Sequence, residues 1–175
     1  MRHRRRFGWT TAVILIALAI VLVPAAPSVL AVDGPRVAVD IAVEREVTKT
    51  DADGRQTSYR EPVDTAFPGD VLVYTLRAEN TGDGPALNTR LEDPIPQGTV
   101  LIPDSVLLDG AEVLASLDDG STWQPFPVRI DHAREDGTRE KVPAPAEAYT
   151  NLRWVLAGNI DPGQRREVSF KVRIQ

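Results

Sequence analysis

The sequence predicts an all-β protein, built as a sandwich of two antiparallel sheets. Several short stretches alternate apolar with polar residues, which is the period of strands that bury one face. Clusters of glycine, proline, asparagine and aspartate separate these stretches and mark turns. After residue 31, no long stretch shows the spacing of an amphipathic helix. Short strands and turns over about 140 residues favour a single sandwich domain.

Four stretches carry the strand pattern, at residues 36–47, 70–80, 151–158 and 166–175. Each places a set of apolar residues on one face of the expected strand. These sets are Val37, Val39, Ile41 and Val43; Leu72, Tyr74, Leu76 and Ala78; Leu152, Trp154 and Leu156; and Val168, Phe170, Val172 and Ile174. Between them, NTGDGP at 80–85, DPIPQG at 93–98 and DPGQ at 161–164 predict turns.

The segment from Asp131 to Ala148, DHAREDGTREKVPAPAEA, differs from the rest of the domain. Its acids, bases and prolines cannot fill an apolar core. We therefore expect a long exposed loop at 131–148, with room for a small hairpin at EDGT.

The first 31 residues have the layout of an export signal. A basic MRHRRR is followed by the apolar run AVILIALAIVLV at 12–23, and Val29 and Ala31 stand where a signal peptidase reads small residues. The apolar run is short of the ~20 residues of a membrane-spanning helix, although Phe7, Gly8 and Trp9 extend it, so an uncleaved anchor stays open. The sequence predicts a signal peptide at 1–31 and a domain at 32–175, placing the protein in the periplasm, on the cell surface or in the medium.

The charge of the expected mature domain argues against a nucleic-acid partner. The four arginines of the signal leave with it, so 16 basic residues face 25 acidic ones. An acidic surface repels phosphate backbones. The chain has no cysteine, which excludes disulfides and thiolate chemistry. We expect no cofactor, a protein or cell-envelope component as partner, and membrane contact only through an uncleaved N-terminal segment.

Several separated motifs resemble one family. Gly69 and Asp70 precede a strand with Tyr74, Asn80-Thr81-Gly82 follows it, and Asp93, Pro94 and Pro96 form a corner. Together with AGNIDPGQRREVSFKVRI near the C-terminus, they resemble the conserved repeat domain of bacterial and archaeal surface proteins, the immunoglobulin-like domain of unknown function number eleven. The resemblance runs from about Val37 to Ile174. It implies an immunoglobulin-like sandwich and an extracytoplasmic structural or interaction role, although the chain holds one copy instead of a tandem array.

The stretch SLDDGSTW at 116–123 is similar to the Asp-box of sialidases and other glycan-processing propellers. A propeller enzyme needs several blades, far more than 144 residues. We therefore interpret the stretch as a structural turn formed by Ser116, Asp118, Gly120, Thr122 and Trp123. In this turn Asp118 accepts backbone N–H groups, Gly120 takes a positive φ, Thr122 begins the next strand and Trp123 covers the hairpin. Asp119 is expected to be free in solvent.

Other residues that carry chemistry are predicted to be structural as well. TDADGRQ at 50–56 resembles part of a calcium loop but lacks the downstream ligands, so a hairpin tip is expected. His132 is the single histidine after residue 31, too few for a zinc site. Trp154 and Tyr74 are expected in the core, whereas Tyr149 and Trp123 are the aromatic residues left as exposed candidates for sugar binding.

We expect no catalytic, cofactor-binding or metal-binding residue, and therefore a protein that is not an enzyme. The preferred hypothesis is an exported structural or interaction module of the cell envelope, acting in adhesion or assembly. Two alternatives remain open. One is a carbohydrate-binding or small glycan-active protein that uses the Asp-box face, and the other is a calcium-stabilised adhesion domain.

Overall fold

The structure is a computed structural model that describes residues 34–107 and 110–175. The predicted signal segment therefore lies outside the described residues. Val32–Gln175 forms one unit by its internal contacts. Within the described ranges, no helix has the length and apolar character needed to cross a membrane.

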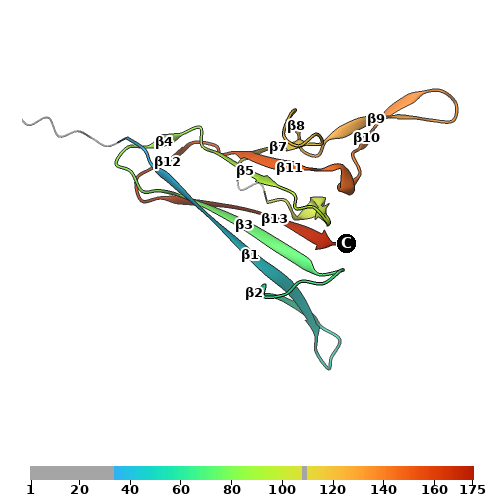
Figure 1. Cartoon of the computed structure of the whole chain (residues 1–175), viewed down its shortest axis with the longest axis horizontal. Helices are drawn as coiled ribbons and strands as arrows, with labels where there is room; N and C mark the ends of the chain where they lie inside the picture. The colour runs from blue at the N-terminus through green and yellow to red at the C-terminus, as the bar shows by residue number, and fades with distance from the viewer. Residues whose placement is uncertain (1–33, 108–109) are drawn as a thin grey trace, which may run out of the picture. The chain divides into compact units, whose positions relative to one another are not determined.

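The larger sheet has five antiparallel strands in the order β2-β1-β3-β13-β6. Figure 1 shows β2, β1, β3 and β13 side by side in this order. Its strands are β1 (Val37–Thr50), β2 (Gln56–Pro62), β3 (Val71–Asn80), β6 (Thr99–Ile102) and β13 (Arg165–Ile174). The first and the last strand of the domain's chain thus flank the central strand β3. This arrangement needs pairing between segments far apart in sequence, because β13 lies about ninety residues after β3.

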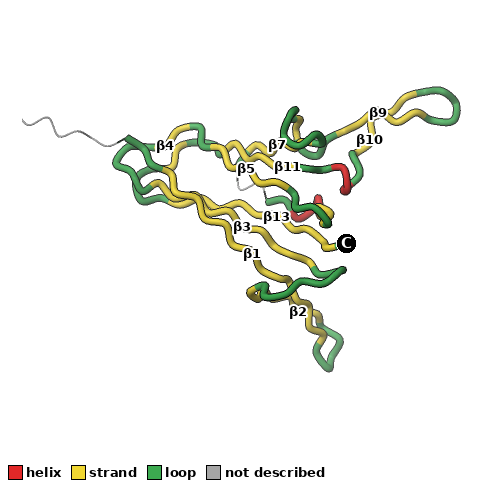
Figure 2. The backbone as a smooth tube through the Cα atoms, in the orientation of Figure 1, coloured by secondary structure: helices red, strands yellow, loops and turns green. Residues whose placement is uncertain are grey.

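The smaller sheet has four strands in the order β5-β11-β7-β8. Its strands are β5 (Arg90–Pro94), β7 (Glu112–Ser116), β8 (Gln124–Pro125) and β11 (Asn151–Val155). Two further pairs are β9 (Arg129–Ala133) with β10 (Arg139–Pro143), and β4 (Ala86–Leu87) with β12 (Asn159–Ile160). Short 3₁₀ turns, η1 (Pro103–Ser105) and η2 (Ala146–Ala148), are the helical pieces of the described chain, and strands dominate it (Figure 2).

The apolar core lies between the two sheets, as the alternation predicts. On the five-stranded sheet, Val168 is paired with Leu76 and Val172 with Leu72, so the apolar faces of β3 and β13 coincide. From the smaller sheet, Trp154 is fully buried, and its ring centroid lies 5.8 Å from that of Phe170 on β13. The all-β sandwich of antiparallel sheets is thus confirmed.

The burial of β1 differs from that of the other predicted strands. Val37, Val39, Ile41 and Val43 share one face, as predicted, because they lie opposite core residues of β3 such as Leu76. However, Val39 is 52% exposed and Ile41 48% exposed. The buried core cluster draws on β3, β13, β6 and the smaller sheet but takes no fully buried residue from β1. The alternation of apolar and polar residues therefore predicts which side chains of β1 share a face, but not whether other segments bury that face.

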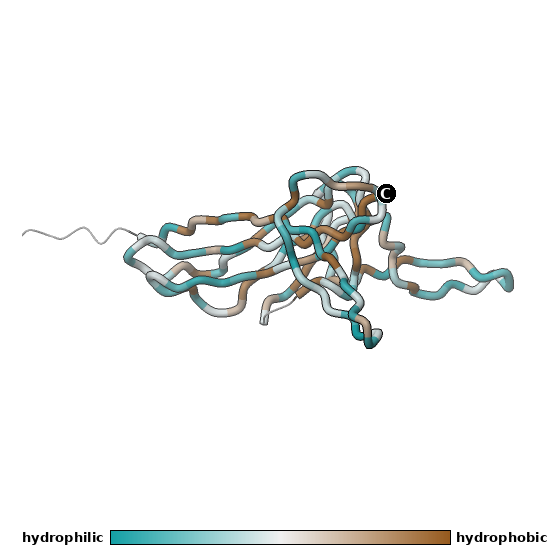
Figure 3. Tube along the Cα trace, turned by 90° about the horizontal axis from the view of Figure 1, so that it is seen from below, coloured by the Kyte–Doolittle hydropathy of each residue, from teal (hydrophilic) through white to brown (hydrophobic). Residues whose placement is uncertain are grey.

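The segment at 131–148 is not a long loop but mostly an antiparallel hairpin. Arg139 is paired with Ala133 and Pro143 with Arg129, and the turn lies at EDGT, where the sequence allowed a small hairpin. Cross-strand ion pairs, including Lys141 Nζ to Asp131 Oδ1 at 3.1 Å, explain how so charged a segment pairs. The hairpin extends away from the sheets, and its tip is hydrophilic (Figures 1 and 3). After it, Ala144 returns to the core.

Asn80 connects the chain entry with two distant turns. Its side chain is fully buried and donates from Nδ2 to the carbonyls of Gly84 and Ile160, both at 2.7 Å. Its Oδ1 accepts the N–H groups of Arg36 at 3.2 Å and Gly82 at 3.1 Å. Gly82 has to be glycine, because a Cβ there would lie 2.4 Å from the carbonyl oxygen of Gly34. These contacts fix where the chain enters β1.

Candidate functional site

The Asp-box-like stretch forms the connection between β7 and β8. Asp118 Oδ1 accepts the N–H of Thr122 at 2.8 Å, and Oδ2 accepts the hydroxyl of Thr122 at 2.7 Å. Ser116 Oγ accepts the N–H groups of Asp118 at 3.1 Å and Gly120 at 2.9 Å, and it donates to Asp118 Oδ1 at 2.7 Å. These hydrogen bonds, led by those from Thr122, lower the pKa of Asp118. The Asp118 carboxylate therefore holds the turn together.

Two details of this turn differ from the expectation. Thr122 lies in the bend before β8 rather than at the start of a strand, because its hydroxyl and N–H both bind Asp118. Asp119, expected to be free, has a φ of +54°, and its N–H donates to Thr150 Oγ1 at 2.9 Å. Its side chain remains exposed. Gly120 has a φ of +81°, as the turn requires.

Trp123 lies against the turn with one face of its ring covered. The Arg153 guanidinium carbon is 3.7 Å from the ring centroid, and Gly120 borders the ring edge. Arg153 is itself held by Glu92, whose Oε1 accepts from Nε at 2.7 Å. A sugar ring stacks on an open aromatic face, and Arg153 already occupies one face of this indole.

A hollow of about 650 Å³ lies next to the turn. Asp119 and Glu147 bring two carboxylates to its wall, and Thr150 and Asn151 add polar groups. Residues 94–99, from the end of β5 to the start of β6, also line it. This arrangement offers hydrogen-bond acceptors and donors to a polar ligand such as a sugar.

Tyr149 is buried, which corrects its expected role as an exposed aromatic residue. It is 4% exposed, and its hydroxyl oxygen accepts the N–H of Val128 at 3.1 Å. Burial raises the pKa of this phenol. The ring packs on Phe126, with centroids 5.6 Å apart. Tyr149 is therefore a core residue, and only its small exposed part contributes to the wall of the hollow beside the turn.

The remaining sequence candidates lie apart from one another. Asp51 Oδ1 accepts the N–H groups of Asp53 and Arg55 at 2.9 and 2.8 Å, which makes TDADGRQ the tip of the β1–β2 hairpin. His132 lies exposed on β9. Within residues 34–107 and 110–175, no three histidine, cysteine, aspartate or glutamate side chains gather as a possible metal site.

Asp93 is a titratable group whose environment the sequence did not reveal. It is 8% exposed on β5, and in the described chain its Oδ2 has no hydrogen-bond partner. Burial raises its pKa to about 6. The sequence placed Asp93 in a turn-like corner, and its burial depends on the packing of β11 beside it.

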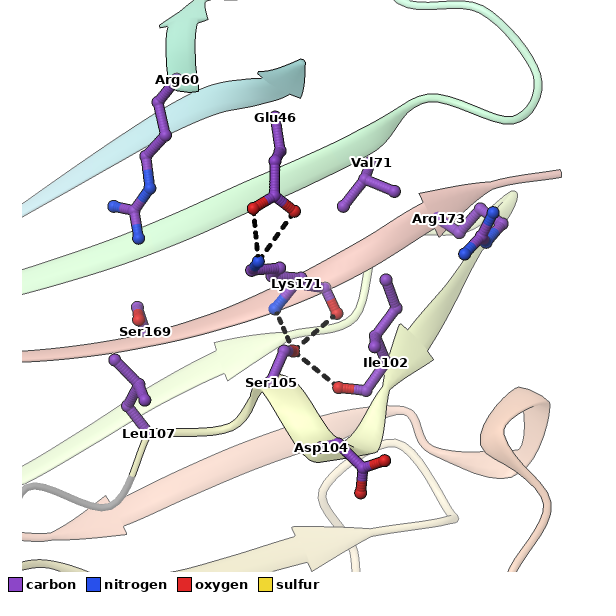
Figure 4. A pocket seen from close by; sticks show the side chains of 10 residues that line it. All are labelled: Glu46, Arg60, Val71, Ile102, Asp104, Ser105, Leu107, Ser169, Lys171 and Arg173. Carbon is purple, nitrogen blue, oxygen red and sulfur yellow. Dashed lines mark hydrogen bonds and ion pairs between the residues drawn. The ribbon is translucent and has the colours of Figure 1, made fainter. Parts of the chain in front are cut away.

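A second hollow, of about 530 Å³, lies on the outer face of the five-stranded sheet (Figure 4). Lys171 Nζ donates to both carboxylate oxygens of Glu46, at 2.6 and 2.7 Å. Ser105 accepts the N–H of Lys171 at 2.7 Å and so ties η1 to β13. Arg60 and Arg173 also line the hollow. Because Glu46 is neutralised by Lys171, the hollow offers polar recognition rather than an acid–base pair.

The first half of β1 has an open edge. β3 pairs with β1 from Val37 to Glu46, whereas β2 pairs with β1 only from Glu44 to Thr50. Among the described residues, Val37–Val43 therefore has no strand on its second side, and β2 lies beside only the far part of β1 (Figure 1). The exposed side chains of Val39 and Ile41 belong to this stretch. Such an edge is a template for another strand.

The comparisons with known proteins add no further identification. No family model, no curated protein and no solved structure matches the chain. The resemblance to the surface-protein repeat domain stays a prediction.

Proposed function

We propose that the chain is an exported, non-catalytic interaction module of the cell envelope or surface, acting in adhesion or assembly. The observation that supports an interaction role is the open edge of β1, where an unpaired apolar strand is exposed. The observation that supports a role without catalysis is the use of the Asp118 carboxylate and the Ser116 hydroxyl inside their own turn. Export rests on the order of charged, apolar and small residues at 1–31.

Fractionation of a secreting host that expresses the full chain tests the export part of this proposal. Residues 1–31 are expected to direct the protein out of the cytoplasm, and the exported product is expected to begin at Val32. A matched chain without residues 2–31 is the control and should stay in the cytoplasm. Intact Met1 in the membrane fraction would favour the anchor over the cleaved signal. Full-chain protein that remains in the cytoplasm contradicts the proposal.

Carbohydrate binding is the second candidate function, and the hollow beside the Asp-box turn favours it. Asp119 and Glu147 both line this hollow. The sequence alone did not predict that these two residues lie close together. A glycan array on the parent protein tests this candidate. Binding that is lost in Asp119→Asn, at an unchanged melting temperature, would favour the carbohydrate function over the interaction module. Binding that is kept in this variant would place the sugar elsewhere.

A further inference from the structure

We propose that the open edge of β1 pairs with the same edge of a second copy of this chain, in antiparallel register about Val39. The inference rests on the proposed interaction function and names its partner. In the resulting dimer, the two five-stranded sheets form one continuous sheet through Val37–Ile41 of each copy. Three features of the described chain support it, namely the direction of the free backbone groups, the character of the other edges and the match of the side chains.

The backbone groups of alternate residues point to the open side. The N–H of Thr81 donates to the carbonyl of Arg36 at 2.7 Å, so the even-numbered residues of β1 direct their backbone groups to β3. On the other side, the N–H of Asp51 donates to the carbonyl of Arg55 at 2.9 Å, so odd-numbered residues face β2. By the same alternation, Val37, Val39 and Ile41 direct N–H and C=O groups to the open edge. An antiparallel partner strand satisfies these groups.

The other sheet edges contain or adjoin prolines, which discourage pairing. Proline has no N–H to donate to a ladder and is a common protection of edge strands. β8 contains Pro125, β5 ends at Pro94, and β6 is followed by Pro103. The stretch Val37–Val43 contains none. It is also rich in β-branched residues, which favour strands. The open part of β1 is therefore the best-suited edge among the described strands for a second chain.

The side chains favour one register. Pairing odd residues with odd residues allows Val39 opposite Val39 of the second copy, with Val37 opposite Ile41. All of these are apolar and lie on the same face. In this register Asp40 lies opposite Ala38 of the second copy. A shift of the pairing by two residues in one direction would place Asp40 opposite Asp40 of the second copy, so that like charges meet. The shift in the other direction would place Pro35, which has no N–H to donate, opposite Ile41. Within the paired stretch Val37–Ile41, the Val39-centred register avoids both conflicts, and like any antiparallel pairing of two identical strands it is two-fold symmetric.

Sedimentation of the exported product of the full chain tests the dimer. We expect the dissociation constant of the dimer to lie below about 1 mM. At about 1 mM protein, more than half of the parent should then be dimeric. Val39→Lys places two ammonium groups opposite each other and is expected to weaken the dimer about tenfold or more. Leu87→Lys, an equal change at another exposed apolar residue (60% exposed), is the matched control and should leave the dimer intact. A monomeric parent, or equal effects of both variants, would overturn the inference.

A mixing experiment tests the register. Val39→Lys and Val39→Glu are each expected to be monomeric alone, because like charges meet at the two-fold axis. An equimolar mixture is expected to dimerise, since the ammonium group of one variant then lies opposite the carboxylate of the other. Because the side chain at this position is exposed in the single domain, the variants should fold like the parent. Failure of the mixture to associate more strongly than either variant would contradict the register.

Amide hydrogen exchange of the parent separates this pairing from other occupants of the edge. The amides of Val39 and Ile41 are expected to gain protection as the protein concentration rises, whereas those of Ala38 and Asp40, which face β3, should not change. Protection of Val39 at concentrations where sedimentation shows a monomer would mean that the same chain covers its own edge, and would overturn the inference. A parent that is exported but monomeric overturns the dimer alone. A parent that dimerises but is not exported overturns the proposed function.

Discussion

The side-chain nitrogen Nδ2 of Asn80 donates a hydrogen bond of 2.7 Å to the carbonyl oxygen of Ile160, eighty residues away in the chain. The same side chain binds the backbone of Arg36, Gly82 and Gly84, so one buried amide makes four hydrogen bonds. Asn80 is the last residue of β3, and its hydrogen bonds connect the segment before β1 with β12, which precedes the turn into β13. Few other side chains of the described chain connect so many segments.

Asn80→Ala is therefore expected to lower the free energy of unfolding by about 3 kcal/mol, because it leaves buried backbone groups without partners. Chemical denaturation monitored by tryptophan fluorescence measures this loss. Asn159→Ala, at an exposed asparagine on β12, is the matched control and should change stability by less than about 0.5 kcal/mol. Similar losses in the two variants would contradict the role assigned to Asn80.

The buried carboxyl of Asp93 predicts an unusual dependence of stability on pH. Its pKa is about 6 in the folded protein and close to 3.9 when unfolded, so the folded state holds the proton more tightly. Stability from this group is then present below about pH 4 and falls as the pH rises to about 6. This difference in pKa between the folded and the unfolded protein lowers the free energy of unfolding by at most about 3 kcal/mol above pH 6. Asp93→Asn is expected to remove the decline between pH 4 and 6, as measured by denaturation at a series of pH values. All other titratable groups are the same in the two proteins, so the difference between their stabilities isolates Asp93. A difference that stays constant between pH 4 and 6 would contradict the prediction.

The β7–β8 turn predicts different costs for three neighbouring side chains. Trp123→Ala is expected to cost about 2–3 kcal/mol, because the partly buried indole packs on Gly120 and Arg153. Asp118→Ala should lower the melting temperature by about 5 °C through its lost turn hydrogen bonds. This difference should shrink as the pH falls through the lowered pKa of Asp118.

Asp119→Asn is the control for this turn, since asparagine tolerates the positive φ and the N–H to Thr150 is kept. Thermal melts of the three variants give the order. A loss in Asp119→Asn as large as that in Asp118→Ala would contradict the structural interpretation of the turn.

Removal of calcium is expected to change the melting temperature by less than about 1 °C. The Oδ1 atom of Asp51 already binds two backbone N–H groups of its own hairpin tip. A calcium ion requires six to eight oxygen ligands, which this tip does not assemble. Melts with EDTA and with millimolar calcium chloride check this. A rise of several degrees with calcium would instead favour the calcium-stabilised adhesion domain.

The sequence predicted those parts of the fold that depend on local patterns. The alternation in β3 and β13 was enough to place Leu76 and Phe170 in the core, because both faces of these strands follow directly from the period of two. The sequence also indicated a turn at EDGT, but it did not predict that β9 and β10 pair along the whole segment on both sides of this turn. Charged residues such as Asp131 and Lys141 suit a loop and a solvated hairpin equally well.

Features that depend on packing between distant segments could not be predicted. The exposure of Val39 and Ile41 depends on which other segments pack on β1, and the alternating pattern of β1 alone does not contain that information. Tyr149 is a core residue because Phe126 and Val128, from the connection between β8 and β9, lie against it. The joint presence of Asp119 and Glu147 at one hollow likewise follows from the position of η2.

The hairpin β9–β10 has a practical consequence for handling the protein. Within its tip, the N–H of Arg134 donates to the carbonyl of Thr138 and the N–H of Gly137 donates to the carbonyl of Arg134. The residues of the tip are hydrophilic (Figure 3) and exposed. An epitope tag or a small fluorophore-binding peptide inserted between Asp136 and Gly137 would therefore interrupt no sheet of the sandwich and would leave β1 and both chain ends unaltered. This loop is the position at which to label the protein for imaging or to graft foreign sequences for surface display.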